Sequence, residues 1–164
     1  MKKEMNNKGF SLVELIIVVA IMAVLVGVLA PQYIKYLDKS KAGTDRQMLD
    51  NLRQAITTTI LDPDLSDPTD HGAPSPDTDA TIDTADWKAI SAKDSSEKFW
   101  KEVFEIMGVA DGTKLLDELN YDPGTNPEIY YYVTNKKQVY VRVMYDKTKT
   151  WNAADANIYD YEIE

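Results

Sequence analysis

A single carboxylate stands at the edge of a long uncharged segment. Glu14 directly precedes twenty residues, Leu15 to Ile34, that carry no charge. Placing a carboxylate inside a membrane costs about 2.5–3.5 kcal/mol on insertion scales, so a residue of this kind is a candidate for a function. The alternative is that Glu14 lies at the membrane interface and reaches water. Residue chemistry alone leaves both interpretations open.

A second group of carboxylates lies far along the chain. Residues 62–86 contain eight Asp and four Pro, and such a segment is typical of a solvated loop. Clustered carboxylates can bind Ca²⁺, and the candidate ligands are Asp62, Asp64, Asp67 and Asp70, or Asp77 and Asp79. The twelve-residue calcium loop that ends in a bidentate Glu is absent, so we expect no cofactor and keep calcium as the alternative.

Other site chemistry finds little support in the sequence. The chain has no Cys, which excludes disulfides and thiolate sites, and one His, which excludes multi-His metal sites. We expect that histidine, His71, to be exposed in the acidic loop rather than catalytic. No phosphate-binding, dinucleotide-binding or hydrolase motif occurs, so we expect no enzyme.

Charge divides the chain unevenly. The net charge of the 164 residues is −9, while residues 57–164 alone carry 10 basic and 22 acidic side chains. The first 56 residues are therefore slightly basic and the remainder strongly acidic. This acidity argues against a nucleic-acid partner, which requires a basic surface.

The uncharged segment has the length of a membrane span. Twenty helical residues extend about 30 Å, the thickness of the hydrocarbon core of a bilayer. A cleaved signal peptide fits poorly, because the apolar run exceeds the usual 7–15 residues and the helical pattern continues beyond it. Ile34 and Leu37 are followed by Met48, Leu49, Leu52, Ile56 and Ile60 at the spacing of one buried helix face. We predict one helix from Phe10 to about Leu61.

The sequence of the acidic C-terminal part of the chain predicts short helices followed by strands. Trp87 to Ile90 is predicted as a helical turn, and Asp94 with Glu97 as a capping box that opens a helix ending at Gly108. Leu115, Leu116 and Leu119 indicate another short helix. Alternating residues then predict three antiparallel strands at 128–134, 138–146 and 157–164, the first two joined by a loop at 135–137. The fold class is α+β, a long N-terminal α-helix packed against a C-terminal antiparallel β-sheet.

The first sixty residues resemble a known family. Lys8-Gly9-Phe10-Ser11-Leu12-Val13-Glu14-Leu15, followed by an apolar run that ends at Pro31, is similar to the class III signal of type IV pilins and pseudopilins. Residues 62–164 match this family only in the coarse order of their elements.

The resemblance implies roles for particular residues. A prepilin peptidase would cut between Gly9 and Phe10, and Phe10 would become an N-methylated N-terminus. Glu14 would neutralise the Phe10 amine of a neighbouring subunit. Gly27 and Pro31 would loosen or kink the helix, since glycine weakens a helix and proline lacks a donor and clashes with the preceding turn.

The same resemblance implies a division of the chain. The expected parts are a removed leader (1–9), a transmembrane or filament-core helix (10–34), an amphipathic continuation (35–61), an acidic loop with short helices (62–127) and a β-meander (128–164). The precursor would cross the cytoplasmic membrane once with its N-terminus inside, an orientation that comes from the family because Lys and Arg are nearly balanced on the two sides.

Structural rather than catalytic function follows from this reading. The expected function is that of a pilin that polymerises with itself and other pilins into a surface filament, with prepilin peptidase and the pilus assembly machinery as partners. Adhesion, motility or DNA uptake by the fibre would come from the family and not from these residues. Two alternatives stay open: a pseudopilin of type II secretion, which calcium in the head would favour, and a binding domain on a membrane anchor.

Overall fold

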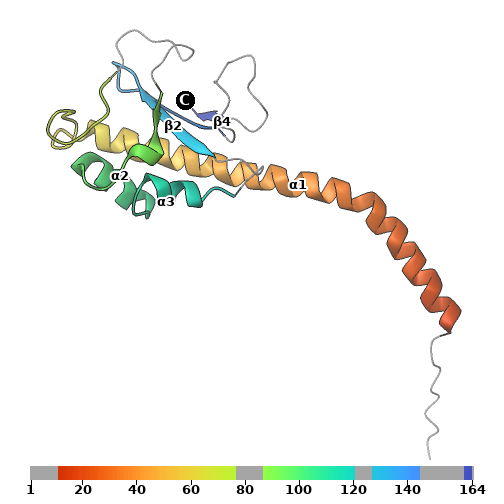
Figure 1. Cartoon of the computed structure of the whole chain (residues 1–164). Helices are drawn as coiled ribbons and strands as arrows, with labels where there is room; N and C mark the ends of the chain where they lie inside the picture. The colour runs from red at the N-terminus through yellow and green to blue at the C-terminus, as the bar shows by residue number, and fades with distance from the viewer. Residues whose placement is uncertain (1–10, 77–86, 121–126, 145–160, 164) are drawn as a thin grey trace, which may run out of the picture. The chain divides into compact units, whose positions relative to one another are not determined.

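The chain forms one long helix that continues into a small α+β unit. The computed structural model describes residues 11–76, 87–120, 127–144 and 161–163. The chain divides into two compact units, residues 1–40 and 41–164. Helix α1, Leu12–Leu61, contributes to both (Figure 1).

The remaining elements belong to the second unit. They are strand β1 (Lys88–Ala89), the 3₁₀ turn η1 (Ile90–Ala92), helices α2 (Lys98–Met107) and α3 (Gly112–Asp117), and strands β2 (Glu128–Val133), β3 (Val139–Met144) and β4 (Tyr161–Ile163). The strands form one antiparallel sheet in the order β1-β2-β3-β4. The predicted α+β arrangement of a long helix and a C-terminal antiparallel sheet is confirmed.

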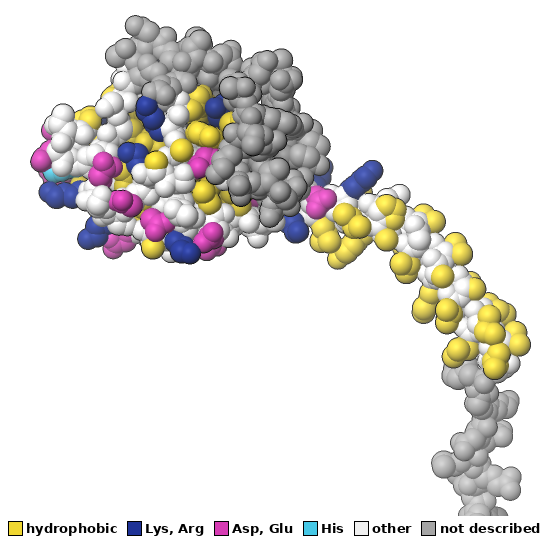
Figure 2. Space-filling view, viewed as in Figure 1, with side chains coloured by type: hydrophobic (Ala, Val, Ile, Leu, Met, Phe, Trp, Pro, Cys, Tyr) yellow, Lys and Arg dark blue, Asp and Glu magenta, His cyan; other side chains and the backbone are white. Residues whose placement is uncertain are grey.

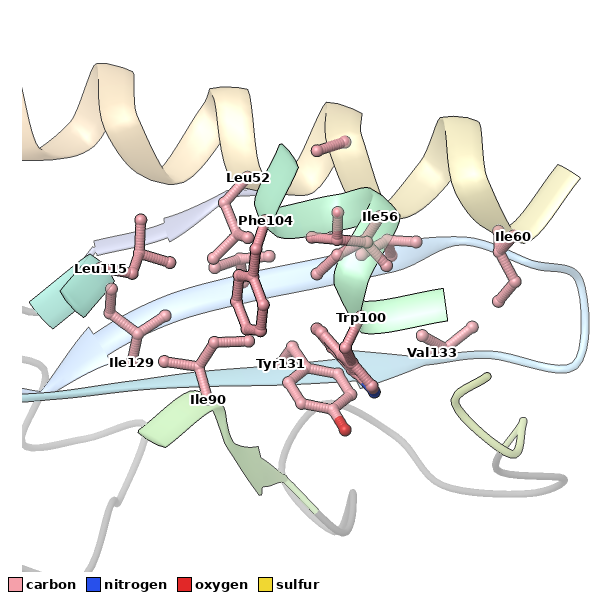
Figure 3. Close-up of a cluster of buried hydrophobic side chains, with 14 of the residues drawn as sticks. Leu52, Ile56, Ile60, Ile90, Trp100, Phe104, Leu115, Ile129, Tyr131 and Val133 are labelled. Atoms are coloured by element: carbon pink, nitrogen blue, oxygen red, sulfur yellow. The ribbon is translucent and has the colours of Figure 1, made fainter. Parts of the chain in front are cut away.

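The second half of α1 supplies one side of the core. Leu49, Leu52, Ile56 and Ile60 are at most 2% exposed, as their spacing predicts. Figure 3 shows side chains from this part of α1, from α2 and from β2 converging on one cluster, with Trp100 and Phe104 among the largest. Burial raises the pKa of the Tyr131 hydroxyl in this cluster, so the group stays neutral.

Three hydrogen bonds stabilise the end of α1, two of them local and one from the hairpin loop. Asp62 begins a turn in which its carboxylate accepts the Asp64 N–H at 2.9 Å. The Asp62 N–H donates to the Thr59 carbonyl. The Lys137 ammonium donates to the Ile60 carbonyl at 3.0 Å and so caps a helix end that has no basic residue of its own. The predicted stop at Asp62 is confirmed.

The hairpin of β2 and β3 matches the two predicted strands and their connecting loop. Pairing runs from Glu128 opposite Met144 to Val133 opposite Val139. In the connecting loop Lys137 has φ +59°, a left-handed conformation that closes a short hairpin. Strand β4 pairs with β3 at Val141, Arg142 and Val143, within the predicted third strand.

Two local predictions are wrong. Lys88 and Ala89 form an edge strand against Tyr131 and Tyr130 instead of a helical turn, because pairing with β2 overrides their weak local preference, and a helical turn begins only at Ile90. Asp94 does not open α2. Its carboxylate accepts the Ser96 N–H at 2.7 Å in a separate turn, and α2 begins at Lys98 without a side-chain cap.

One short part of the acidic loop is less solvated than predicted. Residues 62–70 are largely exposed, but residues 71–74 pack on the unit, where Ala73 is buried and the His71 carbonyl accepts the Phe99 N–H at 3.0 Å. The His71 side chain is only 16% exposed, so the prediction of an exposed histidine is wrong.

One residue on the packed face of α1 is charged rather than apolar. Asp45 is 0% exposed on the packed face of α1 and accepts the Asn120 N–H at 2.7 Å and its side-chain amide at 3.3 Å. These bonds attach α1 to the segment that follows α3.

We expect residues 41–164 to fold without the preceding segment. Every buried apolar side chain of the described chain lies within this unit, so the fragment retains its core. Purified fragment should melt cooperatively, and reductant should leave the melting temperature unchanged because there is no Cys. Phe104→Ala in the same fragment should cost about 3–5 kcal/mol. An unfolded circular dichroism spectrum of the parent fragment would contradict this expectation.

Candidate assembly site at the start of the first helix

The side chains of Ser11 and Glu14 cap the start of α1. The Ser11 N–H donates to Oε2 of Glu14 at 2.9 Å, and the Val13 N–H donates to Oγ of Ser11 at 3.3 Å. The first turn closes with the Leu15 N–H on the Ser11 carbonyl. This is the S-x-x-E capping box, in which two donors without helical partners are satisfied by two side chains.

The capping box places a negative charge where the helix favours one. The N-terminal end of a helix carries a partial positive charge, and the Glu14 carboxylate lies in its first turn. The bond to Ser11 occupies one oxygen, whereas a carboxylate offers about four acceptor positions. Glu14 is therefore held in a fixed orientation and retains capacity to accept further bonds from a cation.

Sequence analysis missed this second role of Glu14. The signal was available, since a Ser followed three residues later by a Glu immediately before an apolar run is the sequence signature of a helix start. The same signature was assigned instead to Asp94 and Glu97, where no helix begins with a side-chain cap. The Glu14 carboxylate caps the start of α1, and it is also the one charge within residues 10–34.

The helix that follows Glu14 exposes apolar side chains on all sides. Every residue from 11 to 37 is exposed, and Val13, Leu15 and Leu29 retain about 60% of their surface. Figure 2 shows apolar side chains along this part of α1. The helix is long and apolar enough to cross a membrane. It continues through Pro31, and a methyl group at Gly27 would meet nothing within 4 Å.

The predicted calcium ligands do not form a site. Asp62 accepts a bond within its own turn, Asp67 accepts the N–H and hydroxyl of Thr69, and Asp70 lies 3.6 Å from the His71 imidazole. The bonds from Thr69 hold the pKa of Asp67 below its usual value. Within the described residues no three acidic or histidine side chains could hold a metal ion, so the structure does not bring Asp62, Asp64, Asp67 and Asp70 together as the calcium alternative requires.

Other predicted residues fall outside the described part. Gly9 and Phe10, the expected cleavage pair, precede the first described residue, and Asp77 and Asp79 lie in the segment 77–86. The structure therefore places Glu14 at the helix start and leaves the residues just before it undescribed.

Comparison with known proteins identifies this N-terminal segment. The prokaryotic N-terminal methylation motif matches residues 5–30, a range that includes Gly9, Phe10 and Glu14. This segment is similar to the N-terminal segment of type IV fimbrial proteins. The methylation motif also covers Gly27, and it ends one residue before Pro31.

Curated relatives agree with the motif. The type IV major fimbrial protein FimA of Dichelobacter nodosus is 42% identical over 56 residues, which are 34% of this chain and 36% of the relative. A further FimA sequence of the same organism is 41% identical over 56 residues. The similarity thus spans only about a third of the length of these pilins. No solved structure matches the chain significantly.

The capping box predicts a measurable effect of Ser11. Replacement by Ala removes the acceptor of the Val13 N–H and should weaken the helix start by about 0.5–2 kcal/mol. The amide of Val13 should then exchange faster with solvent in detergent micelles. Ser11→Thr keeps the acceptor and is the matched control. Unchanged exchange at Val13 in Ser11→Ala would show that the bond contributes nothing.

Proposed function

We propose that this chain is a type IV pilin, a structural subunit that is processed at its N-terminus and polymerises non-covalently into a cell-surface filament. The observation that carries the proposal is the oriented Glu14 carboxylate at the start of a helix whose apolar side chains are exposed all round. Relatives matched over 56 residues are major fimbrial proteins, which supports a filament subunit.

Processing would occur at the peptide bond between Gly9 and Phe10. Both residues lie within the matched methylation motif. Glycine lets a protease approach the backbone closely because it lacks a Cβ. A prepilin peptidase would release residues 1–9, and Phe10 would carry a new, N-methylated amine two residues before α1 begins.

Glu14 would then meet the Phe10 amine of a neighbouring subunit. Opposite charges attract strongly when both leave water, although desolvation offsets much of the gain. The capping bond to Ser11 fixes the carboxylate in advance, so less side-chain freedom is lost on assembly. Its remaining acceptor positions are available for the amine. Glu14 would thus cap the start of its own helix and set the register of the neighbouring subunit.

The apolar helix would have two successive environments. Before assembly its exposed side chains would lie in the cytoplasmic membrane, with the N-terminus inside. In the filament the same side chains would bury one another in a bundle. Gly27 and Pro31 would be the positions where the helix loosens on transfer, and the pilus assembly machinery would drive that transfer. No step of this mechanism requires a cofactor.

A pseudopilin of type II secretion is the second candidate. Calcium in the head would favour it, but Asp62, Asp64, Asp67 and Asp70 do not converge. A binding domain on a membrane anchor would gain nothing from a fixed carboxylate at the edge of its span, since that charge only raises the cost of insertion.

Mass spectrometry tests the processing step. Removal of residues 1–9 takes away a net charge of +2, so the mature subunit should carry −11. Protein from sheared filaments should begin at Phe10 and bear one additional methyl group. Met1 on assembled protein would contradict the proposed processing.

Two substitutions of Glu14 separate the effect of its charge from the effect of its capping bond. Glu14→Gln keeps an acceptor for the Ser11 N–H and removes the charge, whereas Glu14→Ala removes both. We expect both variants to be inserted and cleaved, and both to yield few filaments, because an uncompensated buried amine costs about 3–5 kcal/mol. Filaments sheared from cells are measured against the processed subunit left in the membrane.

The two variants have distinct meanings if they differ. Normal filament yield with Glu14→Gln and loss with Glu14→Ala would show that the cap matters and the charge does not. Normal yield with both variants would refute the role of Glu14 in assembly.

A further inference from the structure

A pocket lies at the β1 edge of the sheet. Its volume is about 660 Å³, and it is bounded by residues 72–76 of the acidic loop, by β1 and η1, and by residues 131–133 of β2. All of these residues belong to the second unit. Pockets that bind small molecules have volumes of about 300–1,000 Å³, so this one has room for a ligand.

Hydrogen bonds within the chain hold the walls of this pocket. The His71 carbonyl accepts the Phe99 N–H at 3.0 Å, which ties the loop wall to α2. On the opposite wall, the Lys93 N–H donates to the Ile90 carbonyl at 2.9 Å, and the Lys93 carbonyl accepts the Gly112 N–H at 3.0 Å. The walls are therefore in place before a ligand arrives, which lowers the cost of binding one.

Gly72 brings the loop wall against Glu97. Its φ is +74°, a conformation that favours glycine, and a side chain at this position would overlap the Glu97 side chain. Glycine therefore lets the loop pack closely on Glu97, which also lines the pocket.

A cation and an anion lie next to each other in the pocket. Nζ of Lys93 is 3.5 Å from Oε2 of Glu97 and 5.4 Å from the centre of the Trp100 ring. Hydrogen bonds between charged groups are usually about 2.7–2.9 Å long, so this pair keeps donors and acceptors for further bonds. An anionic ligand would be repelled by Glu97 and a cationic one by Lys93, and the pair therefore favours a neutral ligand.

The hydroxyl of Tyr131 is a third polar group of the pocket. The Tyr131 side chain is 3% exposed and lines the pocket, and Figure 3 shows its hydroxyl directed away from α1. No hydrogen bond joins this hydroxyl to another described residue. Burial, and next the Glu97 carboxylate, raise the pKa of Tyr131, so the hydroxyl keeps its proton. Polar groups on side chains buried this deeply usually have a partner, and the pocket is where this one can meet it.

We propose that this pocket binds a neutral saccharide or polyol through two neighbouring hydroxyl groups. One ligand hydroxyl would accept a bond from Lys93 and the other would donate to Glu97, while the Tyr131 hydroxyl would bond a further oxygen. Ala89 and Val133, which also line the pocket, would contact the C–H groups of the ligand. A hydroxyl both donates and accepts without carrying charge, so it suits both members of the ion pair.

This inference goes beyond the proposed function and does not depend on it. The pocket is formed by residues between Pro68 and Val133, and binding is measured on the unassembled chain. A chain that forms no filaments would refute the proposed function and leave this site untouched.

Nuclear magnetic resonance titration of the full chain tests the site. The chain is held in dodecylphosphocholine micelles, because this detergent has no sugar headgroup, and the probes are glucose, galactose and mannose. At least one probe should shift the amide signals of Gly72, Lys93 and Glu97 until they saturate. Glucuronate and glucosamine, which add one charge to a hexose ring, should bind more weakly. Absence of saturable shifts with all three neutral sugars, or tighter binding of a charged one, would overturn the proposal.

Tyr131→Phe removes the hydroxyl and keeps the buried ring. It should weaken binding by about two- to tenfold, which is the loss of one hydrogen bond. Tyr140→Phe is the matched control, since Tyr140 lies on the neighbouring strand and does not line the pocket. Equal affinity of Tyr131→Phe and the parent chain would remove this hydroxyl from the site and overturn the proposal.

The ion pair allows a test of specificity that a merely structural role would not pass. Glu97→Gln leaves the Lys93 charge alone and should shift the preference toward glucuronate. Lys93→Met leaves the Glu97 charge alone and should shift the preference toward glucosamine. An unchanged order of the neutral and charged probes in both variants would show that the pair does not select the ligand, and the proposal would fail.

Discussion

The need to shield the apolar first half of α1 from water is the constraint on which the rest of the molecule depends. Its apolar side chains surround the helix, so no single surface of the same chain could cover them. Burial of apolar surface contributes about 25 cal/mol per Å², which makes a lipid bilayer or a bundle of identical helices strongly preferred over water. Glu14 is the exception within this segment, and its hydrogen bond to Ser11 limits the cost of having a charge there.

The second unit, a small α+β unit, is held together without disulfides. The continuation of the same helix forms one wall of its core. Long-range polar contacts supplement the apolar packing. Asp45 holds the segment after α3, and Glu128 accepts bonds from the backbone and hydroxyl of Ser91 at 3.2 and 2.6 Å. These bonds join elements that are far apart in the chain.

Periodicity predicted the parts of the fold in which one face is apolar. Leu49, Leu52, Ile56 and Ile60 follow the helical repeat, and the alternation at 139–144 follows the strand repeat, so both elements and the hairpin could be derived. Strand β1 could not, because two residues carry no period and pair only once β2 is in place. Asp45 and His71 were missed for a related reason, since their burial depends on partners distant in sequence.

The candidate site was predicted by type but not in its geometry. The resemblance of residues 8–15 to the class III signal implied a processed and assembling N-terminus, and the methylation motif matches the same segment. The capping bonds made by the side chains of Ser11 and Glu14 could be inferred from S-x-x-E, but the capping box was predicted at Asp94 instead. Local signatures are ambiguous wherever an acidic residue has a nearer backbone donor, as Asp94 has in Ser96.

The bond between Lys137 and the Ile60 carbonyl also has a consequence in time. Its two residues are 77 positions apart, and those of the Asp45 and Asn120 contact are 75 apart. At translation rates of about 5–20 residues per second, Lys137 is synthesised about 4–15 s after Ile60, the residue whose carbonyl it caps. The apolar segment therefore emerges from the ribosome well before the head can close around the helix. Synthesis order alone gives the membrane the first opportunity to receive the chain.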